Sequence, residues 1–241
     1  MSANNMLSRR GALKLGAGAF IGAATLPMMT GYVNAQGATV LKVAHPSFNQ
    51  DWSPMRGGGA PFRWNSIWWA SPMYFDAEGK INPYVFESWS GSDDKKVWTF
   101  KIAGNAAFSD GSKITAADVK GSWELATMPN TKNQRVSQVL AGVVGYAEVN
   151  GGNGKELPGV VAKDDATVEV TLTASDPIFF MRLGNHIVPI VKASQARTED
   201  GNEKQEWWLP ANGGVTSGPF TMTEQDLDGG KFAFDVNAKF F

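Results

Sequence analysis

The sequence predicts a mixed α+β fold, because strand patterns and a helix pattern follow one another along the chain. Residues 96–102 carry an apolar side chain at every second position, which is typical of a half-buried strand. Residues 159–173 alternate in the same way on both sides of Asp164 and Asp165, which predicts a hairpin. Helical spacing of apolar residues begins after Thr115. These three patterns together favour strands and helices packed on one core.

The predicted helix begins after Thr115 and ends before Pro129. The Thr115 hydroxyl can cap the first turn, and Asp118 supplies an acid three residues later, as in a capping box. Asp110 and Gly111 precede this helix and predict a tight turn. We therefore expect these four residues to shape the scaffold.

Four further segments complete the predicted organisation. Residues 40–44 form a short, nearly continuous apolar run, which favours a buried first strand. Residues 46–62 are rich in proline, glycine and polar residues and predict irregular chain. Residues 178–183 follow a Ser-Asp-Pro sequence that predicts the start of a short helix. Residues 231–241 alternate again and predict a last strand.

The composition excludes several classes of protein. Hydrophobic residues make up 43% of the 241 residues and charged residues 19%, which is too apolar for a disordered chain. The sequence has no cysteine, which excludes a disulfide scaffold and a cysteine-ligated metal site. Lys plus Arg number 22 against 23 Asp plus Glu, so the chain lacks the basic character of nucleic-acid-binding proteins. We expect no nucleic-acid partner.

Residues 1–35 predict an export signal. Arg9 and Arg10 stand in a basic, acid-free start, and a short apolar stretch follows before small residues that end at Ala35. The sequence around Arg9 and Arg10 resembles a twin-arginine export motif. An ordinary secretory signal or an uncleaved anchor is the alternative. We expect cleavage after Ala35 and a mature protein outside the cytoplasm.

Few residues could support catalysis or hold a metal ion. His45 and His186 are the two histidines, and neither lies in a nucleophile motif. A zinc site needs three or four ligands at defined spacings, and the sequence offers no such set. We therefore expect no enzyme activity, no metal and no cofactor. An exported hydrolase is kept as a disfavoured alternative.

Tryptophan is concentrated in one part of the chain. Trp52, Trp64, Trp68 and Trp69 account for four of the nine tryptophans and lie within 18 residues. Indole faces in a loop region suit stacking on a ligand. The same side chains could equally be core residues that anchor a long loop. The sequence leaves both interpretations open for Trp52, Trp64 and Trp68.

Several ordered segments resemble the extracytoplasmic solute-binding proteins of ABC importers, in the oligopeptide, dipeptide and nickel family. The most specific segment runs Phe-Ser-Asp-Gly-Ser-Lys-Ile-Thr-Ala-Ala-Asp-Val at residues 108–119. The full set comprises residues 79–83, 86–89, 97–102, 108–119, 217–220 and 237–241. The resemblance implies a periplasmic two-lobed clamshell, of class II, that closes over a solute and passes it to a membrane permease without chemistry.

The resemblance also implies where a ligand would bind. In the family, the stretch after the first strand lends main-chain hydrogen bonds to the ligand, and here that stretch includes Ser47, Phe48 and Asn49. Together with Trp52, Trp64 and Trp68 these residues are the expected ligand-binding set. Peptide is the expected ligand class. An oligosaccharide stacked on the tryptophans is the alternative, and a binding protein coupled to a chemoreceptor is a further one.

The family is about twice as long as this sequence, so we expect the chain to hold most of one lobe, with the second lobe after residue 241. Within it we expect a signal at 1–35, a sheet subdomain formed by 36–45 and 160–241, and a nested subdomain at 46–159. The expected partners are the solute and the permease subunits of an ABC importer. The protein is expected to be a monomer.

Overall fold

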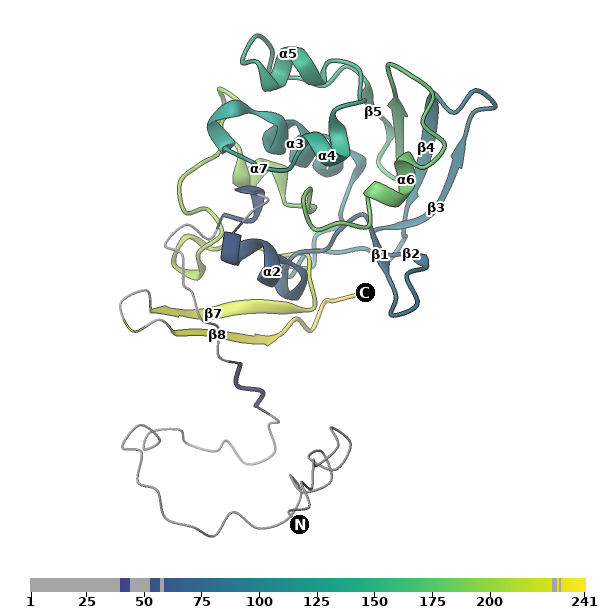
Figure 1. The fold of residues 1–241 in the computed structure, drawn as a ribbon. Helices are drawn as coiled ribbons and strands as arrows, with labels where there is room; N and C mark the ends of the chain where they lie inside the picture. Colours follow the sequence, from purple (N-terminus) through teal and green to yellow (C-terminus); the bar gives the residue numbers. More distant parts are fainter. Residues whose placement is uncertain (1–39, 44–52, 57–58, 227–228, 230) are drawn as a thin grey trace, which may run out of the picture. The chain divides into compact units, whose positions relative to one another are not determined.

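The computed structural model describes residues 40–43, 53–56, 59–226, 229 and 231–241 (Figure 1). The chain divides into two units, residues 1–44 and 45–241. In the first unit, residues 40–43 form no strand, and Leu41 is 85% exposed. The predicted first strand is therefore wrong in this structure. A strand needs the ladder hydrogen bonds of a neighbour, and no described strand pairs with this segment.

A four-stranded antiparallel sheet forms the centre of the second unit. Its strand order is β3-β4-β6-β5. The strand predicted at 96–102 and the hairpin predicted at 159–173 are both confirmed. The buried face follows from alternation, because Trp98 and Phe100 of β4 are buried and lie opposite Val170 and Val168 of β6. The strands are β3 (Phe86–Gly91), β4 (Val97–Ile102), β5 (Val160–Asp164) and β6 (Thr167–Thr171).

The sheet crosses a predicted subdomain boundary. The division expected between residues 159 and 160 would separate β4 from β6, yet these two strands pair along their length. Strand pairing is non-local, so the order of segments along the chain did not reveal it. The nested segment and the segment that follows it share one sheet.

Helix α3 (Ala116–Thr127) packs against β5 and β6 and is the helix that the capping pattern predicted. The Asp118 backbone N–H donates to Thr115 Oγ1 at 3.3 Å, and the Thr115 N–H donates to Asp118 Oδ2 at 3.0 Å. Trp123 is fully buried on its inner face and meets Phe86 edge-on, with ring centroids 6.4 Å apart. The capping box therefore fixes where the helix begins, and its apolar face, which includes Trp123, meets the sheet.

Two further hairpins and a helix flank this sheet. Helix α2 (Gly59–Trp68) contacts β7 (Phe220–Asp226), which pairs with β8 (Lys231–Val236). Figure 1 shows α2 beside the β7–β8 ribbon. The other hairpin consists of β1 (Met73–Phe75) and β2 (Ile81–Pro83). The last strand was predicted to reach residue 241, but it ends at Val236.

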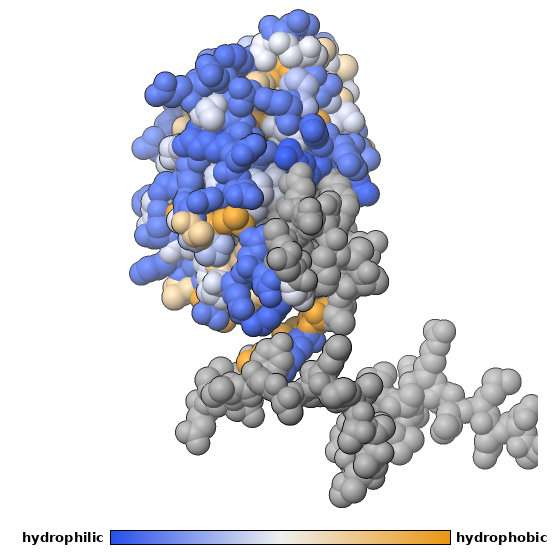
Figure 2. All heavy atoms as spheres, turned by 90° about the vertical axis from the view of Figure 1, so that its left-hand side faces the viewer, coloured by the Kyte–Doolittle hydropathy of each residue, from blue (hydrophilic) through white to orange (hydrophobic). Residues whose placement is uncertain are grey.

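The remaining helices are short. The helix predicted at 178–183 is confirmed as α6 (Phe179–Arg182), which places Phe179 against Phe100 of the sheet. No described helix is long and apolar enough to cross a membrane. The view in Figure 2 shows a face of the second unit that is mainly hydrophilic. The other short helices are η1 (Pro54–Arg56), η2 (Pro129–Thr131), α4 (Ser137–Leu140), α5 (Tyr146–Asn150), α7 (Ala193–Ala196) and η3 (Pro210–Asn212).

Removing the α3 cap should destabilise the protein. Thr115→Ala removes the side-chain acceptor of the Asp118 N–H and leaves only the Thr115 carbonyl, so we expect the free energy of unfolding to fall by about 1 kcal/mol. Thr115→Ser keeps a hydroxyl and should recover most of that loss. Urea unfolding followed by tryptophan fluorescence measures both variants. An alanine variant as stable as the parent protein would contradict this role of the cap.

Candidate functional site: an aromatic pocket

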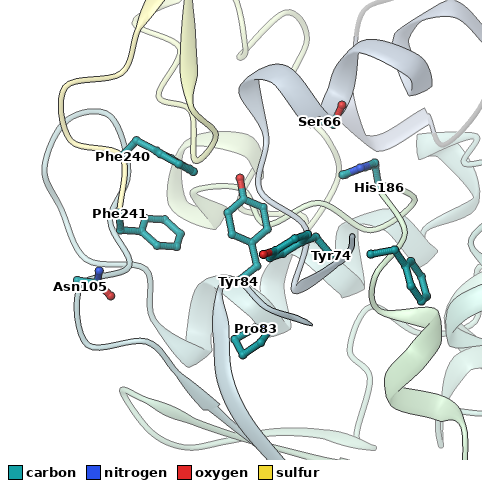
Figure 3. A pocket seen from close by; sticks show the side chains of 9 residues that line it. Ser66, Tyr74, Pro83, Tyr84, Asn105, His186, Phe240 and Phe241 are labelled. Carbon is teal, nitrogen blue, oxygen red and sulfur yellow. The ribbon is translucent and has the colours of Figure 1, made fainter. Parts of the chain in front are cut away.

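A hollow of about 620 Å³ lies beside α2 and the β1–β2 hairpin. This volume lies within the range of small-molecule sites, about 300–1,000 Å³. Figure 3 shows aromatic side chains from separate segments of the chain arranged around it. The lining residues are Ser66, Tyr74, Phe75, Pro83, Tyr84, Asn105, His186, Phe240 and Phe241.

The β1–β2 hairpin supplies one wall of this pocket. Asp76 holds the turn, because its carboxylate accepts hydrogen bonds from the side chain of Asn82 and the backbone N–H of Lys80, both at 2.8 Å. The hydrogen bond from Asn82, followed by that from Lys80, lowers the pKa of Asp76. Tyr74 lies opposite Asn82 in the hairpin register, and Tyr84 follows its last residue. The turn thereby brings two tyrosines to one wall.

Tyr84 lies at the centre of a cluster of rings. Its centroid is 5.8 Å from that of Tyr74, 6.0 Å from Phe240 and 5.9 Å from Phe241. The rings of Tyr74 and Phe240 meet Tyr84 nearly edge-on, at 78° and 71°. These geometries are the favourable ones for aromatic pairs. Burial raises the pKa of Tyr84 from its ordinary value of 10.0 to about 12.

His186 forms the opposite side of the pocket, near Ser66 (Figure 3). Burial lowers the pKa of His186, because the charged imidazolium is poorly solvated there. Its Nδ1 is buried and has no hydrogen-bond partner among the described residues. No Asp, Glu, Lys or Arg is among the lining residues. The pocket is therefore an apolar site with a few neutral polar groups at its edge.

The structure places two of the predicted ligand-binding residues in α2. Trp68 is fully buried, with its ring centroid 5.4 Å from Trp69 and 5.7 Å from Phe234. It presents no face to a ligand in this structure. Trp64 is half-buried against the same core.

Six other residues singled out in the sequence lie outside the described part of the chain. They are the ligand-binding candidates Ser47, Phe48, Asn49 and Trp52 and the signal arginines Arg9 and Arg10. Their roles stay predictions.

The turn before α3 makes contacts within the fold. Gly111 has a φ of +83°, which favours glycine, and Asp110 Oδ1 accepts from the Ser112 N–H at 2.9 Å. Partial burial raises the pKa of Asp110, but hydrogen bonds from Lys192 and Ser112 outweigh it and lower that pKa to about 2. Lys192 Nζ lies 2.5 Å from Asp110 Oδ2. The turn thus joins two distant segments, and its residues do not line the pocket.

Sequence reasoning missed the pocket residues. The sequence analysis gave no role to Tyr74 and Tyr84, and it assigned Phe240 and Phe241 to a last strand that in fact ends at Val236. A signal was available, because Tyr74 and Tyr84 stand on either side of residues 76–80, whose composition favours a turn. Among the described residues no group of three His, Asp or Glu could hold a metal ion.

Comparison with known protein families gives a match over most of the described chain. The family described as bacterial extracellular solute-binding proteins, family 5 Middle, matches residues 80–241. The periplasmic oligopeptide-binding protein OppA of Escherichia coli is 37% identical over 153 residues, which cover 62% of this chain and 27% of that protein. The dipeptide-binding protein DppE of Bacillus subtilis is 31% identical over 179 residues, covering 70% of this chain and 31% of DppE.

Solved structures have the same fold. Haemophilus influenzae OppA, in complex with the peptide RPPGFSPFR, superposes with a TM-score of 0.70 at 24% identity, covering 80% of this chain and 37% of that one. A periplasmic oligopeptide-binding protein of Borrelia burgdorferi gives 0.67 at 26% identity, covering 78% and 37%. The predicted fold class, that of a periplasmic binding protein, is confirmed. The chain spans only 27% to 37% of these relatives.

The burial of Trp68 predicts a large stability loss on truncation. Trp68→Ala should lower the free energy of unfolding by about 3–5 kcal/mol, because it leaves a cavity in the core. Trp64→Ala is the matched control and should cost less, since Trp64 is only half-buried. Thermal unfolding followed by circular dichroism compares the two. Equal losses would contradict the different burial of these side chains.

Acid should destabilise the protein through His186. In the unfolded chain a histidine takes up a proton near its ordinary pKa of 6.5, whereas burial disfavours protonation in the folded state. The free energy of unfolding should therefore fall as the pH drops through 6.5. His186→Gln should show a smaller fall between about pH 7.5 and about pH 5.5. An identical pH dependence in both proteins would contradict this account.

Proposed function

This chain belongs to the bacterial extracellular solute-binding proteins of family 5, and on that basis we propose that it is the periplasmic solute-binding component of an ABC importer. The match to the family over residues 80–241 carries this proposal. Export through the signal at residues 1–35, with Arg9 and Arg10 as a twin-arginine motif, would bring the protein to the periplasm. There it would act as a monomer and deliver its solute to the permease.

The proposed solute is a peptide. Relatives that are 37% and 31% identical are named as oligopeptide-binding and dipeptide-binding proteins. In this proposal the stretch at Ser47, Phe48 and Asn49 lends main-chain hydrogen bonds to the peptide backbone. Such bonds recognise any sequence, because every peptide unit carries one donor and one acceptor. Specificity must then come from pockets for the side chains.

An oligosaccharide is a weaker alternative. Its basis was a platform of exposed indole rings, and Trp68 is fully buried while Trp64 is half-buried. Trp52 alone would not make an extended platform. We also propose that the protein performs no chemical step, since the named relatives are binding proteins.

Calorimetry with the complete gene product tests the ligand class. We expect measurable binding to members of a tripeptide library and none to cello- or xylo-oligosaccharides under the same conditions. Backbone recognition predicts that several peptides of unrelated sequence bind. Binding to sugars alone would overturn the peptide proposal, and hydrolysis of the peptides during titration would overturn the non-enzymatic role.

A further inference from the structure

We propose that Glu203 is a positioning residue for solute binding, whose carboxylate holds residues 53–56 in place and so fixes one end of the proposed peptide-contacting stretch. The inference rests on the proposed function, because it takes residues 47–49 to contact the peptide. Ser53 follows Asn49 by four residues, so a short length of chain links the two. Glu203 itself would not touch the solute and would act through this chain.

The Glu203 carboxylate accepts hydrogen bonds at both of its oxygens, and its side chain is only 8% exposed. Ser53 Oγ donates to Oε1, and Trp207 Nε1 donates to the same oxygen at 3.1 Å. Arg56 Nη1 lies 3.3 Å from Oε2 and supplies the opposite charge. A carboxylate removed from water needs such partners. Glu203 therefore binds the first and the last residue of the segment 53–56.

This segment is too short to hold itself. The three residues of η1 form one turn of 3-10 helix, whose hydrogen bonds are poorly aligned. The Asn65 side chain donates to the Pro54 carbonyl at 3.0 Å, and the Gln134 N–H donates to the Arg56 carbonyl at 3.0 Å. These contacts hold the middle and the far end, whereas Glu203 also holds the end nearest the proposed stretch.

Glu203 has a firm support of its own. The ring centroid of Trp207 lies 5.2 Å from that of Trp69, which is fully buried. The Lys204 N–H, next to Glu203, donates to the Ala196 carbonyl at 2.9 Å. The carboxylate is thus placed by the core and by the backbone, so it can fix a segment that is distant in sequence.

Stability alone is a weak reason for burying this charge. Desolvation offsets much of the attraction in a buried ion pair, so its net contribution to stability is small. Holding a binding segment in one conformation is a stronger reason, because it lowers the entropy lost when the solute binds. The position of Ser53 directly beyond the proposed stretch therefore favours a role in binding.

Calorimetry on the complete gene product tests this role with trialanine and the tightest-binding member of the tripeptide library. We expect Glu203→Ala to weaken binding about tenfold and Ser53→Ala about threefold, since each loosens the segment before the peptide arrives. The double variant should bind like Glu203→Ala alone, because both changes remove one shared contact. Glu203→Gln keeps an acceptor for Ser53 and Trp207 and should weaken binding by about threefold at most.

Thr115→Ala is the matched control. It should lower the stability of the protein through the cap of α3, and it removes none of the contacts of Glu203. We expect it to bind the same peptides as tightly as the parent protein does, which separates loss of position from loss of stability. Thermal unfolding checks that each variant is folded, and Ser53→Ala with Glu203→Gln carries the test if Glu203→Ala does not fold.

Hydrogen exchange measures the anchoring without any ligand. In peptic fragments that cover residues 47–56, we expect amide exchange to be about tenfold faster in Glu203→Ala than in the parent protein. Thr115→Ala should leave exchange in these fragments unchanged. Unchanged exchange in Glu203→Ala would overturn the positioning role.

The calorimetric outcomes separate the two proposals. If no tripeptide binds the parent protein, both fail. If tripeptides bind but a folded Glu203→Ala binds them equally well, if Thr115→Ala weakens binding as much, or if the losses from Glu203→Ala and Ser53→Ala add, the positioning role is wrong and the peptide-binding function stands.

Discussion

Residues Ser217 and Gly218 form the junction on which the rest of this structure depends. Ser217 Oγ accepts from the Ala70 N–H at 2.9 Å and donates to the Ile190 carbonyl at 2.6 Å. The Gly218 N–H donates to the Trp68 carbonyl at 3.0 Å. A Cβ at position 218 would lie 2.5 Å from the Trp68 carbonyl carbon, closer than two such atoms can approach. Only glycine allows these segments to meet.

This junction also positions the pocket. Ser66 precedes Trp68 by two residues, and His186 precedes Ile190 by four. The hydrogen bonds from Gly218 to Trp68 and from Ser217 to Ile190 therefore hold the two segments that carry these pocket residues. The Asn237 side chain donates to the Gly218 carbonyl at 2.8 Å, which fixes the chain just before Phe240 and Phe241. The aromatic walls thus come from distant parts of the sequence, yet their spacing depends on a few buried hydrogen bonds, which are costly to break.

Charged groups hold the fold together elsewhere. Glu124 on α3 is almost fully buried and pairs with Arg197 at 2.6 Å, and its other oxygen accepts from the Leu157 N–H at 3.1 Å. Removing one partner of such a buried pair would leave an uncompensated charge. The ion pair with Arg197 ties the segment after Ile190 to α3, while no Asp, Glu, Lys or Arg lines the pocket. The polar contacts that join these segments therefore lie apart from the aromatic pocket.

The sequence by itself determined the elements whose signals are local. Alternation identified β4 and the β5–β6 hairpin, and the Thr115–Asp118 pair identified the start of α3, because neighbours in the chain decide these features. The ordered motifs also identified the family. Tertiary structure alone decided that β4 pairs with β6 across an expected boundary, that Trp68 is core, and that Tyr74, Tyr84 and Phe240 share one pocket. Each of these depends on which distant segments meet, and neither periodicity nor capping carries that information.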